Sequence, residues 1–174
     1  MSLLAKIFGR QADPKARFVP LWRAVVAIAR EPRWYAECGV ADTQEGRFDM
    51  LSAVLAAVIV RMERDEGLRA QSALLTELFV EDIEGQLRQQ GIGDPTLGKR
   101  MGKLMSALGG RIGAYRAGFA DQSDAALVDA VTRNVTFDET EDGSPACVAR
   151  GLRELHRVLR DASDQDLLRA EFAR

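Results

Sequence analysis

The sequence predicts an all-α fold, a single-domain bundle of about six to eight helices, and three observations predict it. The 174-residue chain is 47% hydrophobic but only 6% aromatic, a composition that favours helices over strands. Apolar residues recur at steps of three and four along most of the chain. Alternating runs of β-branched or aromatic residues are nearly absent, and the best strand candidate, 134–137, is short.

The chain length fits one domain over residues 1–174, which can bury roughly 70% of the surface that the unfolded chain exposes. The longest apolar run, Leu51 to Val60, stops at Arg61 and is too short for a membrane-spanning helix. The first ten residues lack a long apolar region and a cleavage site, so we expect no secretory signal.

The N-terminal segment 1–9 has the pattern of a short amphipathic helix, with basic residues beside the apolar side formed by Leu3, Leu4, Ile7 and Phe8. Two interpretations stay open for this segment: it docks onto the domain core, or it contacts a membrane surface. A helix is then predicted over 16–30, and Pro32 ends it.

The next predicted helix runs from about residue 44 to Arg64, with Asp42 or Thr43 as its N-cap. Its apolar face repeats at steps of three and four through Phe48, Leu51, Leu55, Val58 and Met62. Arg47 and Asp49 stand at the entry of this helix. We interpret them as a structural ion pair or a cap contact rather than as catalytic groups.

Residues 78–119 predict an antiparallel pair, in which an acidic helix is followed by a basic one. The acidic helix begins at Leu68 or Ala70, and the GIGDP stretch at 91–95 ends it. The basic helix has an apolar stripe that must be buried, formed by Leu97, Met101, Leu104, Leu108, Ile112, Tyr115 and Phe119. Its other face is predicted to be uniformly cationic and in water, with Lys99, Arg100, Lys103, Arg111 and Arg116.

Glycines interrupt this basic helix, although each interior glycine costs about 1 kcal/mol of helix stability relative to alanine. Gly98 with Gly102, and Gly109 with Gly113, are four residues apart on one edge, which lets another backbone approach closely. Two interpretations stay open: close packing within the fold, or a groove for a partner helix. The cations exclude a helix that spans lipid.

The rest of the chain predicts a helix over 125–133, an exposed acidic loop over 136–145 and a helix over 147–160. Ser163 is the predicted N-cap of a last short helix, which extends to Phe172.

Nothing in the residue pattern predicts catalysis, a metal or a cofactor. Cys38 and Cys147 lack metal-ligand spacing, and His156 is the single imidazole, so a zinc site is not expected. His156 also lacks a neighbouring nucleophile and is interpreted as structural. A reducing cytoplasm suits this cysteine usage.

The charge balance excludes general attraction to nucleic acid, because the formal net charge is −2. We expect no binding to DNA, since the basic helix has few aromatic residues among its cations. Backbone contact to ribosomal RNA stays open, since that contact needs charge alone.

Two stretches carry a resemblance to a known family, WYAECGVADTQEGRFDML at 34–51 and LFVEDIEGQLRQQGIGDPTLGKRM at 78–101. They resemble the ubiquinol-cytochrome c chaperone family, over roughly residues 21–119. The resemblance implies an all-helical chaperone that holds newly made cytochrome b before it joins the ubiquinol-cytochrome c reductase, respiratory complex III. It also implies a small partner subunit and a place near the ribosomal tunnel exit, as for mitochondrial relatives.

We therefore expect a chaperone or assembly factor that is not an enzyme, located in the cytoplasm, with peripheral contact at the inner face of the membrane as an open alternative. An apolar groove is expected to shield the client. The residues expected to bind the client or a partner are Trp34, Tyr35, Arg47, Phe48, Asp49, Gly98, Lys99, Gly102, Lys103, Gly109, Gly110 and Arg111. The alternatives are a helical module that binds haem or another small molecule and an uncharacterised enzyme.

Overall fold

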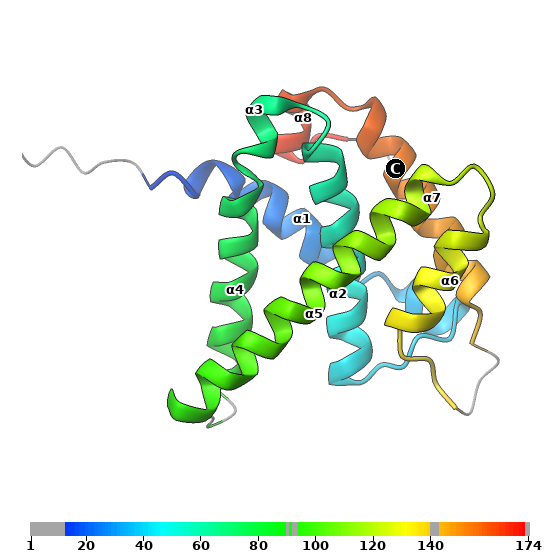
Figure 1. Cartoon of the computed structure of the whole chain (residues 1–174), viewed down its shortest axis with the longest axis horizontal. Helices are drawn as coiled ribbons and strands as arrows, with labels where there is room; N and C mark the ends of the chain where they lie inside the picture. Colours follow the sequence, from blue (N-terminus) through cyan, green and yellow to red (C-terminus); the bar gives the residue numbers. More distant parts are fainter. Residues whose placement is uncertain (1–12, 90, 92–93, 140–142, 173–174) are drawn as a thin grey trace, which may run out of the picture.

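The all-α prediction is confirmed by a computed structural model, which describes residues 13–89, 91, 94–139 and 143–172 (Figure 1). The described helices are α1 (Val19–Ala29), α2 (Gln44–Met62), α3 (Glu66–Arg69), α4 (Ser72–Gln89), α5 (Asp94–Ala120), α6 (Ala125–Asn134), α7 (Pro145–Asp161) and α8 (Asp164–Arg169). A 3₁₀ turn (Ala16–Phe18) precedes α1, and a π-helical turn (Arg33–Glu37) follows it. The predicted short strand is an isolated bridge between Val40 and Phe137. The segment 1–9 lies outside the described residues.

Helix α2 is the centre of the fold, and α1, α5 and α7 pack around it. Every residue of α2 from Met50 to Ile59 is buried, because Ala53, Ala56 and Ala57 let neighbouring helices approach on several sides. The cap prediction is confirmed: the Thr43 hydroxyl accepts a hydrogen bond from the Gly46 N–H at 3.2 Å.

Trp34 belongs to the core and not to the surface. It is fully buried, and its indole N–H donates to the Ile28 carbonyl at 2.7 Å. A Cβ added at Gly151 of α7 would lie 2.6 Å from the Trp34 ring, so α7 packs directly on this ring. The prediction that Trp34 lines a docking surface is therefore wrong, because α7 covers the ring.

Cys38 and Cys147 form a disulfide in this structure, a bond that a reducing cytoplasm does not favour. They are 109 residues apart in sequence. Backbone hydrogen bonds from Asp138 to Gly39 and from Ser144 to Cys38 bring the start of α7 against the π-helical turn. Across the described ranges, no group of three or more His, Cys, Asp or Glu residues could hold a metal ion.

The predicted acidic and basic helices are α4 and α5, and α3 forms a separate short helix before them. α4 and α5 run in opposite directions, meet near their connection and then diverge (Figure 1). α5 packs mainly on α2 and α6. Two cations of α5 pair with other elements, Arg111 with Asp49 of α2 and Arg116 with Glu63. Glu77 and Glu81 of α4 instead pair with Lys15.

The C-terminal helices complete the core. α6 and α7 pack on each other, and α8 contacts α1. The Ser163 hydroxyl accepts a hydrogen bond from the Asp166 N–H at 3.1 Å, which confirms the predicted cap, although α8 ends at Arg169 rather than Phe172. None of the described helices is long and apolar enough to cross a membrane.

Candidate functional site

Helix α5 has the predicted buried stripe. Leu97, Leu108, Tyr115 and Phe119 are buried, and Met101, Leu104 and Ile112 are partly buried against the core. Because α5 is 27 residues long, it extends from the α2–α6 core to its contact with α4. The two edges beside the buried stripe therefore border open surface.

Arg111 is not in water, which corrects the prediction of a uniformly cationic exposed face. Its Nη2 lies 2.6 Å from Oδ1 of Asp49, which is only 5% exposed. Asp49 Oδ2 also accepts hydrogen bonds from the N–H and the hydroxyl of Thr136, at 2.9 and 2.7 Å. The guanidinium lies over the Phe48 ring, 5.1 Å from its centroid. These contacts fasten α5 to α2 and are structural.

Arg47 and Asp49 do not pair with each other. Arg47 pairs instead with Asp42, with 2.6 Å between Nε and Oδ1, and both side chains are exposed. The hydrogen bond from Arg47 lowers the pKa of the Asp42 carboxyl. Arg47 and Asp49 therefore each form a structural ion pair, Arg47 with Asp42 and Asp49 with Arg111.

A second ion pair fastens the C-terminal half of α5 to the end of α2. Arg116 donates from Nε and Nη2 to the two oxygens of Glu63, at 2.8 and 2.5 Å. Together with the Arg111–Asp49 pair, it leaves Lys99, Arg100 and Lys103 as the cations of α5 that are exposed and form no ion pair among the described residues.

Five of the six glycines of α5 are not packed within the fold, whereas Gly118 packs against Leu127 of α6. A Cβ added at Gly98, Gly102, Gly109 or Gly113 would meet nothing within 4 Å, and Gly110 is equally open. The interpretation of close packing is therefore wrong for these five positions, and an open edge of small residues remains.

The glycine groove, as we name it, lies between α4 and α5 and has a volume of about 620 Å³. Its α4 wall carries small side chains, including Ser72, Ala73 and Thr76, and Gly109 stands in its α5 wall. Its apolar lining consists of Ile59, Ala73, Val80, Met105 and Ile112. The small residues of the α4 wall, with Gly109 opposite them, let a third helix approach closely at this point.

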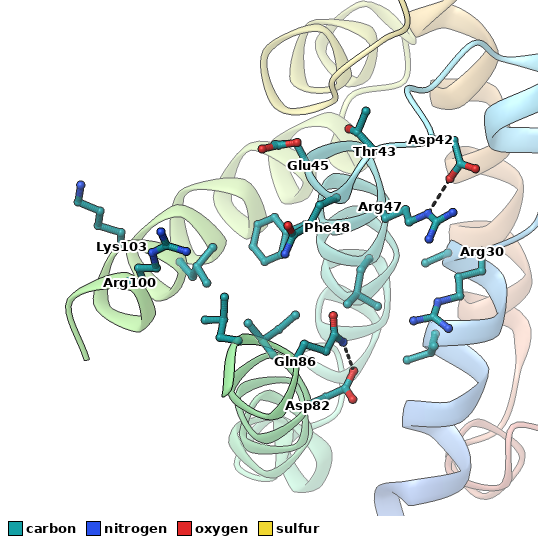
Figure 2. A pocket seen from close by; sticks show the side chains of 17 residues that line it. Arg30, Asp42, Thr43, Glu45, Arg47, Phe48, Asp82, Gln86, Arg100 and Lys103 are labelled. Atoms are coloured by element: carbon teal, nitrogen blue, oxygen red, sulfur yellow. Dashed lines mark hydrogen bonds and ion pairs between the residues drawn. The ribbon is translucent and has the colours of Figure 1, made fainter. Parts of the chain in front are cut away.

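The cationic cleft, as we name it, opens on the other side of α5, between α1, α2, α4 and α5 (Figure 2). Its volume is about 690 Å³. Arg30, Arg47, Arg100 and Lys103 stand at its rim. Its apolar lining consists of Val26, Ala29, Phe48, Leu51, Ile83, Leu87 and Leu104.

His156 lies in neither cleft. Its ring stacks on Phe119, with centroids 4.4 Å apart and planes 8° from parallel. Burial lowers the pKa of His156 to about 4, and Arg153 and Arg160 lower it further in the same direction. The imidazole is therefore neutral at pH 7, and its ring packs on Phe119 rather than lining either cleft.

The predicted binding residues do not form one groove. Arg47, Phe48 and Lys103 line the cationic cleft, and Gly109 lines the glycine groove. Gly98, Lys99, Gly102 and Gly110 are exposed on α5, whereas Trp34, Asp49 and Arg111 serve the core or the α2–α5 contact.

Tyr35 is half-buried, and its hydroxyl donates to the Ala29 carbonyl at 2.8 Å. The sequence analysis missed the α4 wall of the glycine groove. The signal it could have used is the run of small residues Ser72, Ala73 and Thr76, which lie close together on one side of the helix.

Fold and surface together define an all-helical domain with two clefts along one long helix, an arrangement typical of domains that bind other polypeptides. The model of the ubiquinol-cytochrome C chaperone family matches residues 36–174, and the chain belongs to this family. The match extends well beyond residue 119, where the resemblance in the sequence ended.

A solved structure supports the same relationship. The chain is similar to the protein in the crystal structure of the Cbp3 homolog from Brucella abortus, with a TM-score of 0.78 and 31% sequence identity. The similarity covers 98% of this chain and 96% of that chain. No curated protein matches the chain significantly.

Proposed function

We propose that this chain is an assembly chaperone of the ubiquinol-cytochrome c reductase that binds newly made cytochrome b, and that the client lies in the glycine groove. Family membership supports the assembly role. The observation that carries the choice of surface is the open glycine edge of α5 in the groove wall, where no atom of the fold comes within 4 Å of a Cβ added at Gly109.

The chemistry of the groove fits an apolar helix. Its ionic side chains already have partners: Glu63 pairs with Arg116, and Glu77 and Glu81 pair with Lys15. Glu77 and Glu81 share one lysine, which leaves one negative charge in excess, and the rest of the lining is largely apolar. A segment destined for the membrane exposes apolar surface in water, and each square ångström that it buries is worth about 25 cal/mol.

The exposed cations of α5 favour binding to an anionic membrane surface. Lys99, Arg100 and Lys103 are exposed, and a basic residue near an anionic leaflet contributes about 1 kcal/mol of attraction. Peripheral contact at the inner face of the membrane is therefore part of the proposal. The same cations suit ribosomal RNA, and a ribosome or a small partner subunit stays a prediction from the family resemblance.

The cytoplasmic location also stays a prediction. Disulfides persist in oxidising compartments and are rare in a reducing cytosol. The Cys38–Cys147 bond therefore makes the thiol state in the cell an informative measurement of location.

The direct test is a deletion strain that carries an affinity-tagged copy of this chain. We expect the tagged protein to recover cytochrome b, and we expect reductase levels to fall in the strain without it. Unaltered reductase levels, together with no recovery of cytochrome b after crosslinking, would remove the proposal. A purified protein that carries a bound chromophore would instead favour the haem-binding alternative.

A further inference from the structure

The cationic cleft combines apolar and basic side chains, and the proposed binding of cytochrome b in the glycine groove does not involve it. Apolar side chains from four helices form its floor, and Phe48 stands near the middle of the view in Figure 2. Its volume of about 690 Å³ lies within the roughly 300–1,000 Å³ range of small-molecule pockets. The size and lining therefore fit a small ligand with an apolar body.

Basic side chains outnumber acidic side chains in the lining of the cationic cleft. Asp42 is held by Arg47, and Asp82 accepts a hydrogen bond from Gln86 Nε2 at 3.1 Å. Arg30, Arg100 and Lys103 make no ion pair within the part of the chain that the structure describes. The hydrogen bond from Gln86 leaves Asp82 charged, so the four cations of the lining exceed its three acids, Asp42, Glu45 and Asp82, by one positive charge. An acidic group on the ligand would reduce this imbalance.

The arrangement of the cations indicates where that acidic group would lie. Figure 2 shows Arg100 beside the apolar side chains of the cleft, whereas the Lys103 amine points away from them. Arg30 reaches into the cleft from α1, on the opposite side (Figure 2). Arg100 can therefore contact a bound anion directly, while Lys103 strengthens the local positive potential.

We infer that the cationic cleft binds a single-chain anionic lipid, with its acyl chain over the apolar floor beside Phe48 and its acidic headgroup against Arg100. An acyl chain has no polar groups along its length, so burying it on the apolar floor leaves no hydrogen-bond donor or acceptor without a partner. A peptide in extended form would bring N–H and C=O groups that the floor cannot pair.

The test is calorimetric titration of the full chain with palmitate or lysophosphatidylglycerol below their micelle concentrations. Lysophosphatidylcholine, whose zwitterionic headgroup has no net charge, is the matched control lipid. We expect saturable 1:1 binding of an anionic lipid and at least tenfold weaker binding of the zwitterion, about the loss expected for a hydrogen bond to a charged group. Palmitate and lysophosphatidylglycerol distinguish a carboxylate from a phosphate site.

Two variants on α5 distinguish a specific lipid site from nonspecific attraction of the anionic lipid to positive charge. Arg100→Gln and Lys99→Gln each remove one exposed positive charge from neighbouring positions, but only Arg100 lines the cleft. We expect about tenfold weaker lipid binding for R100Q and little change for K99Q. Arg100 has no ion pair among the described residues, so R100Q should fold normally.

A filling variant tests the apolar half of the site. Gln86→Trp places a large ring in the cleft, and Gln89→Trp places one on the exposed surface of the same helix. We expect Q86W to abolish binding and Q89W to keep it. Equal losses in R100Q and K99Q, equal affinity for the zwitterion, or a peptide found in the cleft in place of lipid would each overturn the inference. Cytochrome b recovery is measured separately, so either proposal can fail alone.

Discussion

Gly109→Leu fills the glycine groove from its α5 wall, and Gly110→Leu is its matched control. Both glycines are exposed, both have open space around an added Cβ, and only Gly109 lines the groove. Each replacement removes an interior glycine, so each should raise helix stability by about 1 kcal/mol. For a chain of this size, that gain corresponds to a rise in Tm of about 2–4 °C.

The two variants should differ in client binding. A leucine at position 109 stands where the backbone of a bound helix would approach, and overpacking of this kind costs about 1–3 kcal/mol. Since 1.4 kcal/mol is a factor of ten, we expect recovery of cytochrome b to fall by roughly tenfold or more in G109L. The assay is co-purification from the complemented deletion strain, with thermal unfolding of both purified variants. Equal recovery by G109L and G110L, with both variants stably folded, would refute the reasoning.

Three further predictions concern the fold. Asp49→Asn breaks the buried ion pair with α5 and should lower the free energy of unfolding by about 3–5 kcal/mol in urea titrations; Asp42→Asn, at an exposed pair, should change it little. The folded-state pKa of His156, about 4, lies below its ordinary 6.5, so the unfolded chain takes up the proton first. Stability should therefore fall as the pH drops from about 6.5 to about 4 and should fall less steeply in His156→Gln; identical pH profiles would contradict this account. Cys147→Ser should cost about 2–4 kcal/mol by removing the bond to Cys38, whereas two free thiols trapped directly from cells would show that the bond is absent there.

Much of the helical framework could be predicted because local rules determine it. The apolar stripe from Leu97 to Phe119 follows the helical period, and Thr43 and Ser163 cap helices through contacts three residues away. These signals depend on neighbours in the sequence. They are therefore visible in the sequence before any tertiary contact is known.

The errors concern contacts between distant parts of the chain. Nothing near Trp34 indicates that Gly151 of α7 will pack on its ring. The spacing of Arg111 on α5 predicts an exposed side chain, but this side chain forms an ion pair with the buried carboxylate of Asp49 on α2. The pattern of charges along one helix does not reveal which side chains of another helix will pair with them.

The candidate site was predicted in part for the same reason. The glycines of α5 mark an edge of small residues, but the sequence does not show whether the fold covers that edge. The structure leaves it open beside α4, and it places Phe48 and Lys103 in a different cleft. Only the spatial arrangement separates the two surfaces.

The most direct measurement of the central claim is photo-crosslinking from inside the glycine groove. A photo-reactive amino acid at Thr76, in the α4 wall, and another at exposed Gln89 of the same helix would be incorporated into the chain in cells. The account predicts an adduct with cytochrome b from position 76 and little or none from position 89. Adducts of equal yield from both positions, or cytochrome b captured from position 89 alone, would contradict it.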